Sequence, residues 1–548
     1  MNLNRALFRT FPRPLIGAEL RRFLILSLYV FLGAVTLSPL LWASVPPLVD
    51  YPNNLARMWI LVHRADIPEL ARNYVVHWRI LPDLAMDLVI PVLSTVMPVE
   101  LAGRVFIALV MLGLIAGTVA LHRVLHGRFS VWPVWAVLFI YNAALFWGLL
   151  SCLFAIAVYL FMFSGWIATR EWRIVPRILI FAVAGALLFL LHLFAFGLYG
   201  LSVFSYEVGC RLKGWRLPLK SLVPCAVVCL QFVPGLLLWY ASLENVGSIY
   251  TGNGDLMLKL YALVSPVDFG FSALPLDLGM GLAVTVFLLL FARHGALKLA
   301  PEMRLPLAAM VVAAVLMPYW ANGSALADIR LPVTLPFVVL ASTQFAVSRN
   351  WLPWLLGGVA LVGFGLRIWT VSESWKDYDR WFNEFRAASA IIAPGARLLA
   401  VQATIPAEDT VLEETERLPS VPIALSKVQP MAFLHMGALA VLDRSAFFPF
   451  LFTEATPLDV TPGNRAVSES LGLPVTPEDL AKSADPNLAK SFDALRDTYG
   501  QPLYWRDWPQ TFDYVLWIDF RRMPKPQLTQ LRLLASGSIF EIYQIIRQ

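Results

Sequence analysis

The sequence predicts a polytopic α-helical membrane protein of about eleven transmembrane helices, followed by a C-terminal α/β domain. Of its 548 residues, 58% are hydrophobic and 15% are charged, whereas an average soluble domain has about a quarter charged residues. Charge also divides along the chain. Residues 1–370 hold 26 Lys and Arg against 15 Asp and Glu, and residues 371–548 hold 17 against 22. The basic excess in the apolar part sets membrane orientation and does not indicate nucleic-acid binding.

The first transmembrane helix is expected at about Phe23–Ala43. Five arginines precede it within residues 1–22, and such a basic start predicts a cytoplasmic N-terminus. The loop that follows, at about 44–97, is therefore expected outside the cytoplasm.

That loop contains two helical patterns. Leu55, Trp59 and Val62 recur at helical spacing, and a second pattern covers Leu81–Leu93. Both are typical of amphipathic helices that lie at a membrane surface.

Ten further apolar runs complete the membrane part, within residues 1–370. They are expected at about 98–121, 131–148, 150–168, 177–194, 196–210, 221–242, 276–292, 305–321, 331–347 and 352–370. Basic connectors alternate with nearly uncharged ones along this series, as the positive-inside rule requires.

Residues 371–548 have the composition of a water-soluble domain. An amphipathic helix is expected over Ser372–Ile392. The strand-like runs are Arg397–Val401, Ala438–Leu442, Phe512–Phe520 and Ser538–Ile545, and helical patterns lie at about 476–499 and 525–535. Strands that alternate with helices predict a small α/β domain on the same side of the membrane as the first loop.

Asp50 is the first candidate for chemistry. It lies in the stretch Pro46–Arg57, directly after the first transmembrane helix. Pro52 disfavours helical backbone at Tyr51, so a helix is expected to begin near residue 52 or 53. Two interpretations stay open: Asp50 caps this helix, or it is a reacting group at the membrane surface.

Basic side chains follow in the same region, at Arg57, His77, Arg79 and Arg104. Guanidinium groups at a partly dehydrated interface suit phosphate oxygens, although each of these side chains also suits an interfacial anchor. Arg104 differs from the others, because it lies inside an apolar helix, where an ionisable residue is a functional candidate.

Polar residues near the outer ends of later helices are further candidates. His192 either contacts a ligand or bonds a neighbouring helix backbone. Asn142 and Trp147 suit contact with a sugar, and packing explains them equally well. Asp328 and Arg330 open a late helix, where they form a local salt bridge or Arg330 holds a phosphate.

The sequence lacks the motifs of several common classes of enzyme and transporter. The sequence has no Walker, His-Glu-x-x-His, Ser/His/Asp or heme pattern, which leaves ATP-driven transport and zinc proteolysis unsupported. No metal site is predicted, since the cysteines lie in apolar runs and read as small buried residues; they are Cys152, Cys210, Cys225 and Cys229. Weaker candidates for a second acid or a metal ligand are Asp83, Asp87, Glu244 and Asp255.

The whole arrangement resembles the GT-C glycosyltransferases. It has a basic start, one span, a long outer loop with an Asp near its beginning, two interfacial helices, many further spans and a C-terminal extracytoplasmic α/β domain. The match includes Pro46–Arg57, with the loop Asp at position 50. It also includes Asp328-Ile329-Arg330-Leu331-Pro332, similar to an Arg-(Tyr)-x-x-Pro motif of many members.

The resemblance implies an inverting glycosyltransferase of a bacterial-type inner membrane, working on the extracytoplasmic face. It would move a sugar from a polyprenyl-phosphate donor to a glycan, lipid or protein acceptor. Asp50 would be the general base for the acceptor hydroxyl. Arg330, Arg104, His192 and Arg79 would stabilise the departing lipid phosphate. Weaker substrate contacts are expected from Arg57, His77, Asn142, Trp147 and Asp328.

No cofactor is required by the sequence. Many family members have an acidic pair in the first loop, but here Asp50 is followed by Tyr51. A divalent cation therefore stays an open alternative. Besides donor and acceptor, the expected partners are membrane lipids, without nucleic acid.

A non-catalytic function is the alternative, as a transporter of lipid-linked glycans or an assembly subunit of an envelope polysaccharide system. A transporter is expected to have charges near the middle of the membrane and broken helices in paired repeats. The sequence has no internal repeat, and its charges cluster at one membrane face.

Overall fold

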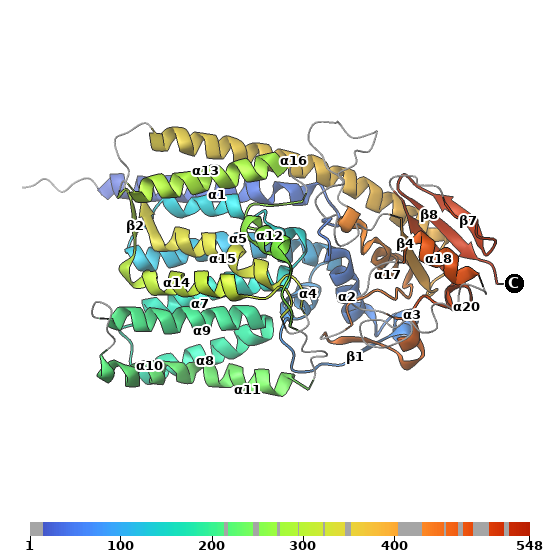
Figure 1. Ribbon diagram of the computed structural model, residues 1–548, viewed down its shortest axis with the longest axis horizontal. Helices are drawn as coiled ribbons and strands as arrows, with labels where there is room; N and C mark the ends of the chain where they lie inside the picture. Colours follow the sequence, from blue (N-terminus) through green and yellow to red (C-terminus); the bar gives the residue numbers. More distant parts are fainter. Residues whose placement is uncertain are drawn as a thin grey trace, which may run out of the picture.

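The structure is a computed structural model that describes residues 15–212, 218–244, 251–270, 274–293, 295–321, 324–345, 352–403, 430–453, 456–468, 475–485, 503–519 and 525–547. The molecule is elongated (Figure 1). Long helices lie roughly parallel at one end, and a small sheet lies at the other.

Six stretches among the described residues are long and apolar enough to cross a membrane: Glu19–Leu41, Val99–His126, Leu150–Ala168, Ile174–Leu191, Leu193–Arg211 and Val223–Ser242. They are formed by α1 (Leu15–Leu37) with the 3-10 helix η1 (Ser38–Leu41), α5 (Val99–His126), α7 (Leu150–Ala168), α8 (Ile174–Leu191), α9 (Leu193–Arg211) and α10 (Leu222–Cys229) with α11 (Val233–Ser242). The chain is thus a multi-pass membrane protein, as predicted.

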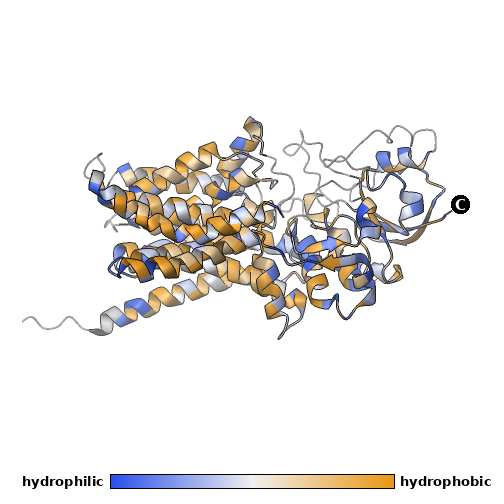
Figure 2. Cartoon of the chain, turned by 90° about the horizontal axis from the view of Figure 1, so that it is seen from below, coloured by the Kyte–Doolittle hydropathy of each residue, from blue (hydrophilic) through white to orange (hydrophobic). Residues whose placement is uncertain are grey.

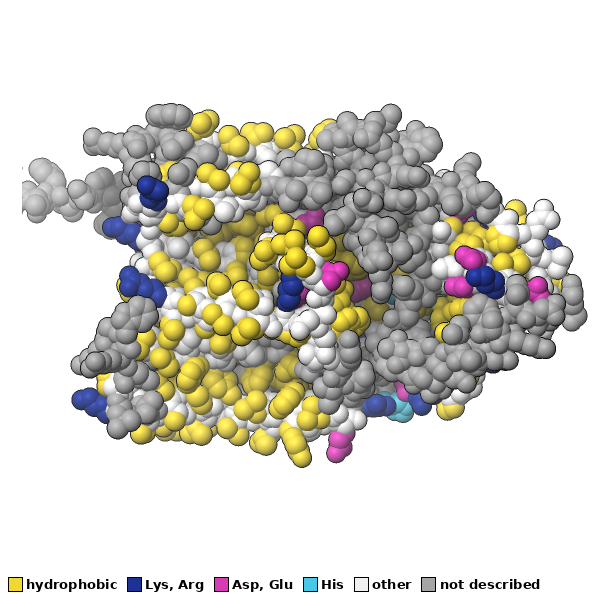
Figure 3. Space-filling view, viewed as in Figure 1, with side chains coloured by type: hydrophobic (Ala, Val, Ile, Leu, Met, Phe, Trp, Pro, Cys, Tyr) yellow, Lys and Arg dark blue, Asp and Glu magenta, His cyan; other side chains and the backbone are white. Residues whose placement is uncertain are grey.

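The surface of this bundle is largely apolar (Figures 2 and 3). Lys and Arg side chains gather at the bundle end farthest from the sheet (Figure 3). Such a surface suits lipid along the sides of the bundle and water at its end.

Four further helices complete the bundle: α13 (Leu274–Arg293), α14 (Arg304–Leu316), α15 (Ala327–Ser342) and α16 (Leu352–Ala388), with α12 (Leu256–Val264) beside α15. Two short strands, β2 (Leu297–Leu299) and β3 (Thr343–Phe345), pair antiparallel. Helix α16 joins the span predicted at 352–370 to the predicted amphipathic helix in one element of 37 residues.

The segment 131–148 is not the regular membrane helix that we predicted. It forms a 3-10 helix, η2 (Trp132–Phe139), and a single turn, α6 (Ala143–Phe146). Asn142 between them has extended backbone and caps α6. Nearly every residue of the segment is buried in protein, and an apolar run of this kind does not distinguish a buried irregular segment from a spanning helix.

The first loop forms α2 (Tyr51–His63), α3 (Pro68–Asn73), β1 (Tyr74–Val76) and α4 (Ala85–Leu93). Both predicted helices are present. However, α2 is largely enclosed by protein, since nine of its thirteen residues are buried. It packs against α4, α5 and a C-terminal helix, α17 (Leu439–Arg444).

The C-terminal region holds a four-stranded sheet of order β4-β6-β8-β7, formed by Leu398–Gln402, Tyr514–Ile518, Phe540–Ile545 and Leu531–Ser536. Strands β4 and β6 are parallel, and the other neighbours are antiparallel. Short helices α18 (Pro477–Ala484) and α20 (Trp508–Thr511) accompany the sheet.

Two predictions in this region were wrong. Ala438–Leu442, predicted as a strand, lies in α17 and the 3-10 turn before it. Segment 525–535, predicted as a helix, holds β7, because pairing with β8 outweighs local propensity. The predicted helix at 476–499 begins as α18, and its part from residue 486 lies outside the described residues.

The first loop and the C-terminal region are interleaved. Strand β1 pairs antiparallel with β5 (Leu458–Val460). Ser44 Oγ donates to Asp379 Oδ1 at 2.6 Å, and Phe433 stacks on Tyr378 of α16, with ring centroids 5.1 Å apart. The border at 370/371 therefore separates the chain in sequence, while in space the first loop lies between the helical bundle and the sheet (Figure 1).

Candidate active site

Asp50 occupies the N-cap position of α2, but its side chain does not cap the helix. The carboxylate makes no hydrogen bond to the first turn, and 23% of the side chain is exposed. The helix-cap interpretation is therefore wrong. The carboxylate is held at the helix start with its oxygens available for other contacts.

A neighbouring turn fixes the backbone of Asp50. Its N–H donates to the carbonyl of Trp147 at 3.2 Å, and the N–H of Val49 donates to that of Phe146 at 3.0 Å. Gly148 follows with φ +81°, and a Cβ placed there would lie 3.1 Å from the nitrogen of Asp50. A glycine at this position gives both the left-handed backbone and the close approach.

His435 lies opposite Asp50, although it belongs to the C-terminal region. Its Nε2 is 3.6 Å from Asp50 Oδ1, and its Nδ1 is 2.9 Å from the side-chain nitrogen of Asn53, one turn along α2. The ring is almost completely buried. The C-terminal region thus contributes a titratable side chain at the candidate base.

A second group, the loop–bundle cluster, consists of Arg57, Asp83, Asp87, His192 and Arg330. Arg57 and Asp87 form a buried ion pair, with Nε 3.1 Å from Oδ1 and Nη2 3.1 Å from Oδ2. Burial raises the pKa of Asp87, and the Arg57 charge opposes this. Arg57 is therefore neutralised by a carboxylate and does not stand free for a substrate.

Asp83 is the most unusual residue of this cluster. Its backbone has φ +81°, a conformation that few non-glycine residues adopt. Removal from bulk water raises its pKa to about 6, while Arg57 and Arg330 act against this increase. Its side chain is 55% exposed, so Asp83 is accessible from solvent.

His192 faces Asp83 across the end of the bundle. Its Nδ1 accepts the N–H of Phe194 at 3.1 Å, which caps α9, and its Nε2 lies 4.0 Å from Asp83 Oδ1. Because Nδ1 is an acceptor, the neutral ring has its proton on Nε2, toward Asp83. His192 therefore bonds the helix backbone and presents a donor to the cluster.

Arg330 completes the cluster from α15. Its charge acts on both Asp83 and His192, and Nη2 donates to Ser324 Oγ at 2.5 Å. Among the residues that the structure describes, its buried Nε has no hydrogen-bond partner. Asp328 does not pair with it, since its carboxylate lies 3.7 Å from Lys259 Nζ. Arg330 is thus free of the local salt bridge and keeps a donor for an anion.

Asp50 and the loop–bundle cluster are set apart along α2. Arg57 follows Asp50 by seven residues, which is about 10 Å along a helix. Among the described residues, no ion pair or hydrogen bond joins Asp50 to Arg330. The structure therefore holds Asp50 at one place and, at another, a mixed group of charges in which Arg57 is paired with Asp87 and Arg330 is not paired with Asp328.

The chain is similar in shape to ArnT, a GT-C glycosyltransferase. A crystal structure of ArnT from Cupriavidus metallidurans in the apo state matches it with a TM-score of 0.50 over 97% of this chain and 99% of ArnT, at 12% sequence identity. The chain has a GT-C-like fold. A second crystal structure, of ArnT from Cupriavidus metallidurans bound to undecaprenyl phosphate, gives a TM-score of 0.47 over 95% and 97%, also at 12% identity. No model of a protein family matches the sequence, and neither does any curated protein.

The other predicted basic residues, Arg104, His77 and Arg79, differ in how deeply they are buried in this fold. Arg104 is half-buried on α5, where its charge acts on the Tyr51 phenol beside Asp50. His77 and Arg79 are exposed on the loop between β1 and α4, away from the contacts described above. The predicted basic site therefore divides into a buried group and an exposed pair.

Asn142 and Trp147 form hydrogen bonds within the protein. The oxygen of Asn142 caps α6, and its amide donates to the carbonyls of Phe139 and Ile140 at 2.8 and 3.1 Å. Trp147 donates to the Tyr261 hydroxyl at 3.3 Å and accepts the N–H of Asp50. Both residues build the turn that holds Asp50, as the packing interpretation predicts.

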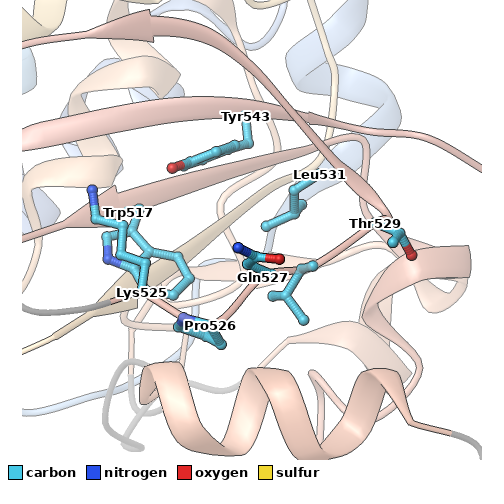
Figure 4. Close-up of a pocket in the computed structure, with 8 residues that line it drawn as sticks. Trp517, Lys525, Pro526, Gln527, Thr529, Leu531 and Tyr543 are labelled. Atoms are coloured by element: carbon cyan, nitrogen blue, oxygen red, sulfur yellow. The ribbon is translucent and has the colours of Figure 1, made fainter.

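Neither a metal cluster nor the cavity on the C-terminal sheet coincides with the predicted site in the described part of the chain. Within the described ranges, no group of three or more His, Cys, Asp or Glu side chains is placed to hold a metal ion. A cavity of about 310 Å³ lies on the C-terminal sheet, between Trp517, Tyr543 and the segment from Lys525 to Leu531 (Figure 4). None of the predicted site residues lines it.

Proposed function

We propose that the chain is an inverting glycosyltransferase that moves a sugar from a polyprenyl-phosphate donor to a glycan, lipid or protein acceptor. The fold and the sequence resemblance support this. The observation that carries it is Asp50: a partly exposed carboxylate that caps no helix, held by a dedicated turn at the outer end of the bundle.

Asp50 is the general base in this reaction. Its carboxylate takes the proton of the acceptor hydroxyl while that oxygen attacks the anomeric carbon of the sugar. The bond from this carbon to the phosphate oxygen breaks, and the electron pair leaves with the lipid phosphate. Attack opposite the leaving group inverts the anomeric configuration.

Cations then stabilise the negative charge that builds on the phosphate. Arg330 has a buried donor with no partner in the described part of the chain, and His192 presents its Nε2 proton to the same region. Arg104 adds a half-buried charge, and Arg79 on the exposed loop suits the lipid headgroup. Fixed cations in a poorly hydrated site stabilise a developing charge more strongly than they would in water.

The reaction as proposed needs no cofactor, since Asp50 removes the proton and protein cations hold the phosphate. We place the site on the extracytoplasmic face of a bacterial-type inner membrane. The basic side chains at the opposite bundle end then face the cytoplasm, in agreement with the positive-inside rule (Figure 3).

The test is Asp50→Asn, assayed in membranes with a radiolabelled polyprenyl-phosphate sugar and an extract of envelope acceptors. Without a base, the transfer rate should fall by about 10²- to 10⁴-fold. The control is Asp66→Asn, because Asp66 is an exposed carboxylate on the same loop. If Asp50→Asn transfers sugar at the wild-type rate with equal protein in the membrane, the chain acts without this base, as a transporter or an assembly subunit would.

A further inference from the structure

His435 is the only histidine of residues 371–548, and it lies against Asp50. Its side chain is 2% exposed. The ring stacks on Phe450, with centroids 4.9 Å apart at 21°, and meets Phe452 edge-on at 5.0 Å. These contacts fix the plane of the imidazole, so its two nitrogens have fixed neighbours.

The orientation of the Asn53 amide is determined by two backbone groups. The N–H of Phe452 donates to Asn53 Oδ1 at 3.0 Å, and Asn53 Nδ2 donates to the carbonyl of Phe450 at 2.8 Å. A backbone N–H only donates and a carbonyl only accepts, so the amide cannot be reversed. The second hydrogen of Nδ2 therefore points at His435 Nδ1, 2.9 Å away.

This amide determines the protonation of the imidazole. Because His435 Nδ1 receives a hydrogen, it must be the unprotonated nitrogen, and the neutral ring carries its proton on Nε2. A doubly protonated ring would place two donors against each other at Nδ1. Asn53 therefore holds His435 as a neutral donor whose N–H is directed at Asp50.

The Nε2 to Oδ1 distance of 3.6 Å is longer than a good hydrogen bond. Catalytic hydrogen bonds are often long in the free enzyme and tighten when substrate is bound. When this distance shortens, the N–H stabilises the Asp50 charge and holds the orientation of the carboxylate. It does so without an arginine, whose fixed charge would weaken Asp50 as a base.

We propose that His435 is a positioning residue for Asp50, so that the C-terminal domain completes the catalytic centre through the chain Phe452–Asn53–His435–Asp50. The proposal rests on the proposed function of Asp50. It assigns the C-terminal domain a part in the chemical step, through the contact between His435 and the loop carboxylate.

A matched pair of variants separates this function from packing. The amide nitrogen of His435→Gln reaches the place of Nε2 and keeps a donor toward Asp50. His435→Asn keeps a partner for Asn53 at the place of Nδ1 and loses the donor toward Asp50. Transfer kinetics with the polyprenyl-phosphate sugar, and melting temperatures in detergent, are measured for both.

We expect kcat to fall about tenfold in His435→Asn, the effect of one hydrogen bond to a charged group. KM for the donor should stay within about twofold, because the lipid phosphate is bound elsewhere. His435→Gln should keep kcat within about threefold of wild type. Equal losses in both variants, in proportion to their melting temperatures, would reduce His435 to a packing residue.

The two proposals fail in different ways. If Asp50→Asn is inactive and His435→Asn has the wild-type kcat, Asp50 is the base and His435 does not position it. If Asp50→Asn is fully active, the proposed function fails first. In the double variant Asp50→Asn/His435→Asn, the second change should add no further loss, since His435 acts through Asp50.

Discussion

Asp50 and Asp83 lie on the same loop but have different surroundings. Asp50 faces a histidine at 3.6 Å and, within the described part of the chain, has no arginine or lysine within ion-pair distance. Asp83 lies among the charges of Arg57 and Arg330. Asp83 is therefore tied into a group of charges, whereas the partly exposed Asp50 stays available for the proposed acceptor hydroxyl.

The raised pKa of Asp83 predicts how the stability of the protein depends on pH. The pKa of the Asp83 carboxyl is 3.8 in an unfolded chain and about 6 in the folded protein. Between pH 4 and 6, the folded protein therefore binds a proton that the unfolded chain has released. The stability that Asp83 contributes is thus highest at low pH and declines as the pH rises through this window. Asp83→Asn stays neutral and also tolerates positive φ.

We expect Asp83→Asn to melt at a higher temperature than wild type at pH 7 and at the same temperature at pH 4. Melting curves in detergent at pH 4, 5, 6 and 7 measure this difference. A difference that is constant across the four values would show that Asp83 does not titrate in this window.

Among the elements, the turn formed by α6 and Gly148 has the most direct effect on the site. In Gly148→Ala, the positive φ costs about 1–2 kcal/mol, and the new methyl group lies 3.1–3.2 Å from the Asp50 nitrogen and Cβ. Because a misplaced catalytic group reacts slowly, kcat should fall about ten- to a hundredfold.

Gly127→Ala is the control for this prediction. Gly127 ends α5 with φ +68°, and no atom lies within 4 Å of a Cβ placed there. The variant should lose similar stability, read from its melting temperature, and retain its kcat. If both glycine variants lose activity equally, the loss comes from general destabilisation and not from the displacement of Asp50.

The sequence predicted those helices and strands whose apolar residues recur at a regular spacing. The long apolar helices, the two helices of the first loop and strands β4, β6 and β8 were predicted close to their observed places. Segment 131–148 was predicted wrongly because it is buried irregular backbone. Strand β7 was predicted wrongly because it depends on pairing with its partner strand, β8. Apolar content does not reveal which neighbour an element will pack against.

Prediction of the candidate site from the sequence was limited in the same way. Asp50, His192 and Arg330 were found because each is a polar group at the end of an apolar run. His435 was missed, since its contact with Asp50 joins positions 385 residues apart. The available signal was a single histidine within an apolar stretch of the C-terminal region, Met431–Ala438. That signal also fits a buried core histidine.

In the whole molecule, the C-terminal region is joined both to the first loop and to the helical bundle. The pairing of β1 with β5 forms one connection. The other is Arg386 of α16, whose guanidinium contacts Asp443 of α17 at 2.6 Å and Glu100 of α5 at 2.8 Å. The hydrogen bonds that Arg386 donates to Asp443 are the largest cause of its raised pKa, and the negative charges of Asp443 and Glu100 add to this increase. The segment that carries His435 directly precedes α17, which holds Asp443.

Arg386→Met tests whether this contact holds the C-terminal domain on the site. The change keeps most of the side-chain length and leaves two partly buried carboxylates without their cation, at a cost of about 1.5–3 kcal/mol. The melting temperature should fall, and hydrogen exchange in α17 should become faster. The kcat should fall as well, because His435 would no longer be held against Asp50.

The matched control is Arg465→Met, which removes a 3.0 Å ion pair with Asp459 whose arginine is 70% exposed. Exposed pairs contribute little to stability, so this variant should resemble wild type in all three measurements. If Arg386→Met also resembles wild type, apolar contacts such as Phe433 on Tyr378 hold the two halves together without it. If instead it loses stability but keeps its kcat, the placement of His435 does not depend on this ion pair.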